Sequence, residues 1–366
     1  MVGAPGPTPQ NRSFPMRSIG NMKAARMHKN GGPGVLKYEE VPLPKPKRGE
    51  FLVEVHAAGI NPVDTKIREG TFAVFKAHLP ATIGRDVAGV VRAVGTGGKA
   101  AFKVGDPVFG MLDYDRGSYA EFTLASAREL ARRPKKVSEK DAGAIGVAAL
   151  TAWQGLFDHG RLKKRQRVLI HGAAGGVGHF AVQFAKYAGA TVIATSSERD
   201  LKWVKALGAD EAIDFKNQKF EEHTGNIDLV FDLISGETQE RSWQVLKEVG
   251  GALISTLSEP DKAEARRHKA RSLRMLVRAD TKQLRKIAGL IATNRVKVAV
   301  EKVFPLKSAA DAHRYLEKGH VRGKVALRMP GQWDFVGPRS SRDSQVPAEQ
   351  LAIFSSVNLT GLAPFY

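Results

Sequence analysis

A glycine-rich turn between a buried strand and a helix is the segment of this sequence with the most specific chemistry. Residues 167–196 have the pattern of a strand, a turn with Gly175 and Gly176, a helix that opens near Gly178, and a second strand. Glycines let the backbone approach a pyrophosphate without a Cβ in the way, and the helix N-terminus adds free N–H groups and partial positive charge. Ala173 stands where the full fingerprint has its first glycine. We therefore predict a dinucleotide site with contacts from Ala173, Ala174, Gly175, Gly176, Val177 and Gly178.

The end of the second strand decides which dinucleotide is expected. A site for NAD usually has Asp or Glu there, to hold the ribose 2′-hydroxyl. This chain instead has Ser196 and Ser197, with Arg199 just beyond. Hydroxyls and a guanidinium suit a 2′-phosphate, which a carboxylate would repel. The carboxylate of Glu198 would oppose a 2′-phosphate, unless it faces away as the first residue of a helix. The predicted cofactor is NADPH.

The elements around this turn predict an α/β fold. From residue 147 to 296, strands alternate with helices, which is typical of a doubly wound parallel sheet of the Rossmann type. Residues 23–146 are rich in short Val-containing strands separated by Pro and Gly, so they predict a separate β-rich domain. Residues 297–330 look like a return to that first domain. Residues 1–22 are expected to be a flexible tail, and residues 331–366 a mobile extension.

The sequence pattern predicts several helices, among them the following two. One begins after Ser138, a residue suited to a helix N-cap, and runs on through small residues to position 157. The other covers residues 238–249. The histidines His56, His171 and His179 lie in strand or helix patterns of the core, where we expect structural roles rather than catalysis or metal binding.

Composition excludes several kinds of site. The chain of 366 residues has no cysteine, which removes disulfides, a thiolate nucleophile and cysteine-bound zinc. The turn after the strand also lacks the serine of a hydrolase nucleophile elbow. A net charge of +20 attracts polyanions, but the second of two basic runs, 161–167 and 265–278, has no aromatic residues for stacking on RNA bases. A solvated basic face is the preferred interpretation, and RNA binding is the alternative.

No segment predicts a membrane span. The long uncharged stretch 168–185 is interrupted by glycines and two histidines, and it fits a buried strand, turn and helix better. Residues 1–22 contain Arg12 and Arg17 and no acid, but they lack the apolar core of a secretory signal. We therefore expect a cytoplasmic protein, with a mitochondrial or other organellar location as the alternative.

The whole patterned chain, residues 22–329, resembles the zinc-free medium-chain dehydrogenase/reductases, the quinone oxidoreductase and zeta-crystallin group. The matching segments include FLVEVHAAGINPVD, IGRDVAGVVRAVG, HGAAGGVGHFAVQFAK and GHVRGKVALR. The resemblance implies a GroES-like catalytic domain with its active site in the cleft against the Rossmann domain. It also implies reduction of quinones or α,β-unsaturated carbonyls by NADPH, and a homodimer. An enoyl-thioester reductase and an NADPH-holding RNA-binding protein of the same fold are the alternatives.

The resemblance also implies roles for single residues. Asn61 and Thr151 would lie near the nicotinamide as catalytic candidates, with Asn61 orienting the substrate or the ribose. Lys324 would lie near the cofactor cleft. Members with catalytic zinc have Cys at the position of Asn61 and a His-Glu pair at the position of Arg85 and Asp86, so the resemblance implies no metal site.

Overall fold

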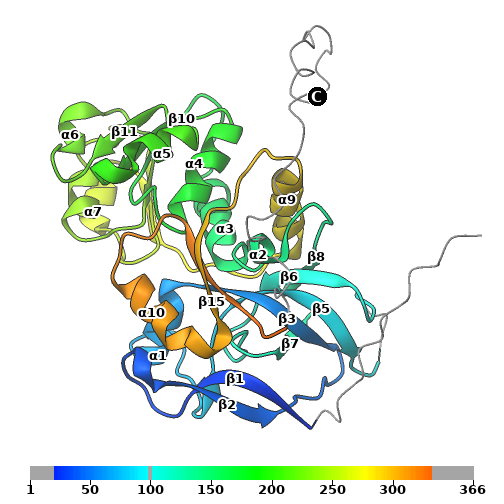
Figure 1. The fold of residues 1–366 in the computed structure, drawn as a ribbon. Helices are drawn as coiled ribbons and strands as arrows, with labels where there is room; N and C mark the ends of the chain where they lie inside the picture. Colours follow the sequence, from blue (N-terminus) through cyan, green and yellow to red (C-terminus); the bar gives the residue numbers. More distant parts are fainter. Residues whose placement is uncertain (1–19, 98–100, 332–366) are drawn as a thin grey trace, which may run out of the picture. The chain divides into compact units, whose positions relative to one another are not determined.

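The computed structural model describes residues 20–97 and 101–331 (Figure 1). The predicted tail and C-terminal extension lie almost wholly outside these residues. The described chain is mixed α/β, with one antiparallel-rich sheet, one parallel sheet and a small three-stranded sheet. The predicted fold class is therefore confirmed.

The larger β-rich sheet is organised around β3 (Glu50–Ile60), an almost wholly buried strand. β3 pairs antiparallel with strands from early in the chain and with one from near its end, so it holds both regions together. The sheet order is β15-β16-β3-β5-β6-β8, with β7 beside β3. Its other strands are β5 (Asp86–Val94), β6 (Pro107–Met111), β7 (Phe122–Ser126), β8 (Leu130–Arg132), β15 (Val300–Pro305) and β16 (Lys324–Arg328). The small sheet contains β1 (Asn21–Met27), β2 (Leu36–Pro42) and β4 (Ala81–Thr82).

Helix α1 (Pro62–Glu69) begins directly where β3 ends. Pro62 occupies its first turn, where a missing N–H is harmless, and the carboxylate of Asp64 accepts a hydrogen bond from the backbone N–H of Asn61 at 2.8 Å. Gly70 ends the helix in the left-handed region at φ 76°. These local rules fix Asn61 at the junction of strand and helix. A further helix of this region is α10 (Ala309–Glu317), which lies between β15 and β16 in the sequence.

The parallel sheet has six strands in the order β11-β10-β9-β12-β13-β14. The chain builds one half outward from β9 and then returns to build the other half from β12. Ligands of such sheets bind at the carboxyl ends of the strands, at the point where the order reverses. The strands are β9 (Arg167–Ile170), β10 (Thr191–Ser196), β11 (Glu211–Asp214), β12 (Leu229–Asp232), β13 (Ala252–Ser255) and β14 (Arg271–Arg274). The accompanying helices are α4 (Gly178–Tyr187), α5 (Leu201–Ala206), α6 (Phe220–His223), α7 (Glu237–Ser242), α8 (Lys262–Arg267) and α9 (Thr281–Ala292).

Helix α3 (Gly146–Trp153) packs between the two regions (Figure 1). One continuous hydrophobic cluster contains Phe109 of β6, Leu150 of α3, Phe180 of α4 and Phe231 of β12. The two sheets therefore share a core through α3. The domain boundaries at 146/147 and 296/297 stay predictions.

Two of the predicted helices, the one after Ser138 and the one over 238–249, are shorter in the structure. The segment after Ser138 forms α2 (Glu139–Ala142), then α3, then a π-helical turn at Gln154–His159. A Cβ on Gly143 would lie 2.9 Å from the backbone of Ala57, and one on Gly146 would lie 2.5 Å from the carbonyl oxygen of Gly110. The break thus lets the backbone approach the β-rich sheet closely.

The helix predicted over 238–249 ends at Ser242. Beyond it, Leu246 forms an isolated parallel bridge with Ile227, and the side chains of Trp243, Val245 and Leu246 are buried in the core. Tertiary pairing overrides the helical pattern here. The basic run 265–278 likewise contains a strand that its composition did not predict, β14 at the edge of the parallel sheet.

Candidate active site

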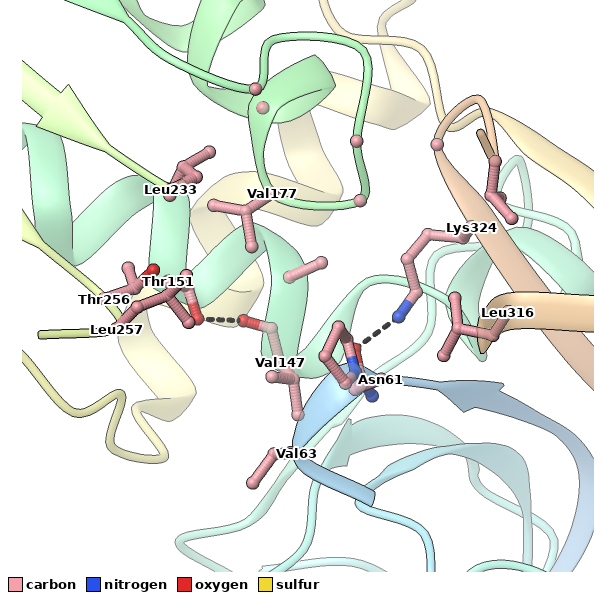
Figure 2. A pocket seen from close by; sticks show the side chains of 18 of the residues that line it. Asn61, Val63, Val147, Thr151, Val177, Leu233, Thr256, Leu257, Leu316 and Lys324 are labelled. Atoms are coloured by element: carbon pink, nitrogen blue, oxygen red, sulfur yellow. Dashed lines mark hydrogen bonds between the residues drawn. The ribbon is translucent and has the colours of Figure 1, made fainter. Parts of the chain in front are cut away.

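A cavity of about 470 Å³ lies where the glycine turn after β9, the junction of β3 with α1, and the start of β16 meet (Figure 2). It is thus at the order reversal of the parallel sheet, with the β-rich region opposite. Ala173 and Arg199 do not line this cavity. The other predicted site residues do: Asn61, Thr151, Ala174, Gly175, Gly176, Val177, Gly178, Ser196, Ser197 and Lys324.

The glycine turn leaves its backbone open to the cavity. A Cβ on Gly178 would lie 2.2 Å from the carbonyl oxygen of Gly172, so only glycine allows this contact between helix and turn. A Cβ on Gly175 would meet only that same oxygen, at 3.4 Å. Ala173 is buried, and its N–H bonds to Thr195 O at 3.1 Å, which ties the turn to β10. The free N–H groups at the start of α4 fit the pyrophosphate of a dinucleotide.

A cluster of three charged side chains lies at the end of β10. Ser197 Oγ donates to Asp200 Oδ2 at 2.9 Å, and Arg199 Nε lies 3.4 Å from Asp200 Oδ1. Arg322 Nε donates to the same Oδ1 atom from the segment before β16. Burial alone would raise the pKa of Asp200, but the hydrogen bonds from Arg322 and Ser197 hold it below its usual value. Asp200 lines the cavity and, like Arg322, was not predicted as a site residue.

Asn61 is held by an acidic and a basic side chain. Its amide Nδ2 donates to Asp86 Oδ2 at 3.0 Å, and its Oδ1 accepts from Lys324 Nζ (Figure 2). Lys324 Nζ also donates to Ile60 O at 2.8 Å and lies 3.3 Å from Asp86 Oδ2. An amide offers two N–H donors and two lone pairs on its oxygen. Asn61 therefore keeps one N–H for a ligand, whereas the three N–H bonds of Lys324 all have protein acceptors.

Thr151 can only accept a hydrogen bond from a ligand. Its hydroxyl donates to the carbonyl oxygen of Val147 at 2.7 Å, one turn earlier in α3 (Figure 2). The side chain is nearly buried and lines the cavity. Because its one proton is already used, Oγ1 offers a ligand only its lone pairs. Such an acceptor suits the amide N–H groups of a nicotinamide and does not stabilise an oxyanion.

A buried polar network lies behind Asn61. Its N–H donates to Asp64 Oδ2, and the hydroxyl of Tyr119 donates to the same oxygen at 3.1 Å. Burial raises the pKa of Asp64 to about 7, and burial together with Asp64 raises that of Tyr119 well above its usual value. His313 Nε2 lies 3.2 Å from the Tyr119 hydroxyl, and burial, followed by the nearby Arg68, lowers the His313 pKa to about 3. None of these four inner side chains lines the cavity.

The three histidines of the sequence-based prediction are buried and bonded within the protein. His171 Nδ1 lies 3.1 Å from Thr195 Oγ1, and His179 bonds to a backbone carbonyl. Burial lowers the pKa of both to about 4. His56 Nδ1 lies 2.7 Å from Glu139 Oε1, and although burial opposes its charge, this contact raises its pKa. Their environments are those of structural histidines.

Apolar and aromatic side chains line the cavity beyond Asn61, among them Val63, Phe72 and Tyr114. Arg85 also lines this part and is almost wholly buried. Its only role in the sequence analysis was to occupy a position where zinc enzymes have a ligand. Across residues 20–97 and 101–331, no group of three or more His, Cys, Asp or Glu side chains is placed to hold a metal ion.

Comparison with known proteins gives the same architecture. Residues 47–135 match the family model described as the alcohol dehydrogenase GroES-like domain, and residues 207–327 match the model described as zinc-binding dehydrogenase. The chain is 34% identical to 2-methylene-furan-3-one reductase of Solanum lycopersicum, over 84% of this chain and 79% of that one. It is 33% identical to quinone oxidoreductase of Pongo abelii, over 84% and 97%. The crystal structure of Escherichia coli quinone oxidoreductase complexed with NADPH superposes with a TM-score of 0.77 at 28% identity, over 84% and 99%.

Proposed function

Because the chain belongs to the zinc-free quinone oxidoreductase family of medium-chain dehydrogenases/reductases, we propose that it transfers hydride from NADPH to a quinone or an α,β-unsaturated carbonyl compound. The chain is an oxidoreductase that uses a nicotinamide cofactor. The observation that carries the proposal is the continuous cavity from the Ser196–Ser197 segment, along the glycine turn, to the apolar surroundings of Asn61. One end suits a dinucleotide and the other suits a flat apolar acceptor.

NADPH is proposed over NADH from the charges at the end of β10. Ser196 and Ser197 line the cavity there, and the two guanidinium groups of Arg199 and Arg322 share one carboxylate, that of Asp200. The cluster keeps one net positive charge, which favours a 2′-phosphate. The Escherichia coli quinone oxidoreductase of the comparison was crystallised with NADPH.

The protein's part in the reaction is positioning and the exclusion of water. Ala174–Gly178 would hold the pyrophosphate and Thr151 the nicotinamide amide, and the cofactor, when bound, supplies the hydride. Asn61, fixed by Lys324 and Asp86, would direct its remaining N–H at the ribose or the acceptor. The apolar lining keeps water from the reacting atoms. The reduced acceptor can take its proton from solvent, so the site needs no general acid.

The test begins with the cofactor and proceeds to the acceptor. Titration of the protein with NADPH and NADH, followed by fluorescence, should give tighter binding of NADPH. Consumption of NADPH is then followed by absorbance with panels of quinones, enones and enoyl-thioesters. The expected result is turnover of quinones or enones above that of enoyl-thioesters. Tight NADPH binding with turnover of the thioesters alone would select the alternative enzyme, and no turnover in any panel would reject the proposed reaction.

An RNA-binding function finds less support in the structure than in the composition. Several side chains of the two basic runs are engaged with the protein itself. Arg271 donates to the carbonyl oxygens of His159 and Gly160, and Arg278 lies within 3.3 Å of Asp158. A labelled RNA that binds with a steep salt dependence and is displaced by NADPH would restore this alternative.

A homodimer and the compartment remain proposals. β14 is at the edge of the parallel sheet, so its outer edge can pair with a second copy. Light scattering should then give twice the mass of one chain. Within the described residues, no helix has the length and apolar character needed to cross a bilayer. The cytoplasm is the proposed location, with an organelle as the alternative, and imaging of the tagged full chain would decide.

A further inference from the structure

Arg85 has a guanidinium group that the protein holds in place but does not neutralise. The residue directly precedes β5 and is 3% exposed. Its Nε donates to the carbonyl oxygen of Leu112 at 3.0 Å, and its Cζ lies 3.8 Å from the centre of the Tyr114 ring. One edge and one face of the group are therefore fixed. The remaining edge is that of the terminal nitrogens.

This remaining edge is short of partners. Nη1 of Arg85 is buried and has no hydrogen-bond acceptor, and no carboxylate of the described chain forms an ion pair with Arg85. The neighbouring Asp86 is already engaged by Lys324, Asn61 and the backbone N–H of Val147. A buried charge without a partner is strongly unfavourable. A guanidinium group in this state is suited to bind a ligand that supplies the missing hydrogen-bond acceptor.

The surroundings of Arg85 indicate what that ligand is. The side chain lines the same cavity as Asn61, whose position is shown in Figure 2. The ring of Tyr114 stacks with Phe75 at 5.8 Å and lies 5.2 Å from the ring of Phe72. These rings form an apolar wall beside the Arg85 cation. An apolar, unsaturated molecule with an oxygen that can carry negative charge fits both features.

We propose that Arg85 binds the carbonyl oxygen of the acceptor and stabilises the negative charge that forms on it during reduction. This inference rests on the proposed function. When hydride adds to the carbon conjugated to the carbonyl, the π electrons move onto the oxygen and give an enolate, or a hydroquinone anion from a quinone. The guanidinium N–H groups hold that oxygen until it, or the adjacent carbon, takes a proton from solvent. Arg85 is thus the catalytic residue for the acceptor, and Asn61 and Thr151 serve the alignment of the reactants.

The test compares Arg85→Met and Arg85→Lys with Arg132→Met. Arg132 is the matched control, because its guanidinium also lies over an aromatic ring, that of Phe102, but it does not line the cavity. Loss of one oxyanion donor typically lowers the turnover rate by roughly 100-fold or more. Arg85→Met should therefore lower kcat/KM for the acceptor by about that factor, with the Kd of NADPH within about twofold of the parent. Arg85→Lys should retain part of the rate, and Arg132→Met all of it.

Two further measurements separate catalysis from structure. Removal of an unpaired buried cation should leave the Tm unchanged or higher. Bound 4-nitrophenol should ionise more readily in the parent protein than in Arg85→Met, as seen by its absorption. Parent-like kcat/KM in Arg85→Met, or a lowered Tm with unchanged ionisation of the probe, would overturn the inference. If the parent reduces no acceptor, the proposed function fails, while the nitrophenol titration still tests the binding of an oxyanion by Arg85.

Discussion

Lys324 Nζ on β16 lies 3.3 Å from Asp86 Oδ2 on β5, and both side chains are almost wholly buried. The same lysine donates to the side chain of Asn61 and to the carbonyl oxygen of Ile60. The ammonium group of Lys324 therefore connects β16, the last strand of the described chain, to the junction of β3 and α1. Its role is to neutralise Asp86 and to orient Asn61.

Replacement of Lys324 by Met should be strongly destabilising, because it leaves the buried charge of Asp86 without a counter-ion. Breaking a buried pair in this way costs about 3–5 kcal/mol. The double variant Lys324→Met/Asp86→Asn should recover a large part of that loss. Urea unfolding of the parent, both single variants and the double variant measures the coupling. Additive effects in this cycle would show that the two charges do not interact.

Thr151→Val should weaken cofactor binding by roughly tenfold, because it removes one hydrogen-bond acceptor while keeping the shape of the side chain. Thr151→Ser keeps the hydroxyl and its bond to Val147 and should bind like the parent. Fluorescence titration with NADPH measures both. An equal loss in the serine variant would contradict the role given to the oxygen.

The two glycines of the turn provide a contrast between binding and folding. Gly175→Ala places its Cβ 3.4 Å from the nearest atom, so the fold should tolerate it, while the methyl group obstructs the pyrophosphate. Gly178→Ala forces a contact of 2.2 Å with the backbone at Gly172 and should lower the Tm of the protein without cofactor. NADPH affinity and Tm are measured for each variant. The prediction fails for Gly175 if its Tm falls as far as that of Gly178→Ala.

Asp200 should limit the preference for NADPH over NADH. In Asp200→Asn, the guanidinium groups of Arg199 and Arg322 lose a negative partner and become available to a 2′-phosphate. The Kd of NADPH should fall about fivefold to tenfold, while that of NADH changes little. Arg199→Glu should act in the opposite direction. Equal changes for the two cofactors would show that neither side chain senses the phosphate.

The carboxyl group of Asp64 should make stability depend on pH. Burial raises its pKa from the ordinary 3.8 to about 7, so the folded protein holds this proton more tightly than the unfolded chain does. This contribution is complete below about pH 4 and is lost as the pH rises through about 7. Asp64→Asn resembles the protonated acid and should raise the Tm relative to the parent near pH 8 more than near pH 5. A constant difference across that range would mean that the group does not titrate there.

The parts of this site that could be predicted from sequence are local. The glycine turn, its strand and its helix lie within one run of about 30 residues, where the turn chemistry of Gly175 and Gly178 is decided by immediate neighbours. Fold class followed from the same kind of local pattern, strands alternating with helices. The prediction of a helix over 238–249 was wrong beyond Ser242. There the bridge between Leu246 and Ile227, a tertiary contact, outweighs the local preference for a helix.

The parts that were missed depend on residues far apart in the chain. Arg322, which was not predicted as a site residue, meets Asp200 across 122 positions. Lys324 was expected near the cofactor cleft, but its contacts with Asn61 and Ile60, 263 and 264 positions away, were not. The sequence around Arg85 does not predict a binding role for it either, because that role is inferred from the absence of a hydrogen-bond acceptor for its buried Nη1. Spacing and composition contain no information on such encounters. The contacts of Arg322 and Lys324 form only because the chain returns to the β-rich region after α9.

That return also sets an order of events during synthesis. β3 needs β16 beside it, and β16 is the last strand of the described chain. The parallel sheet has all its strands once Arg274 has left the ribosome, well before Lys324 does. Domains generally fold as units during translation, so the region translated first is the one completed last. Until then, the part of β3 that pairs with β16, residues 57–60, is an unpaired strand edge in the nascent chain, and such edges are prone to aggregation.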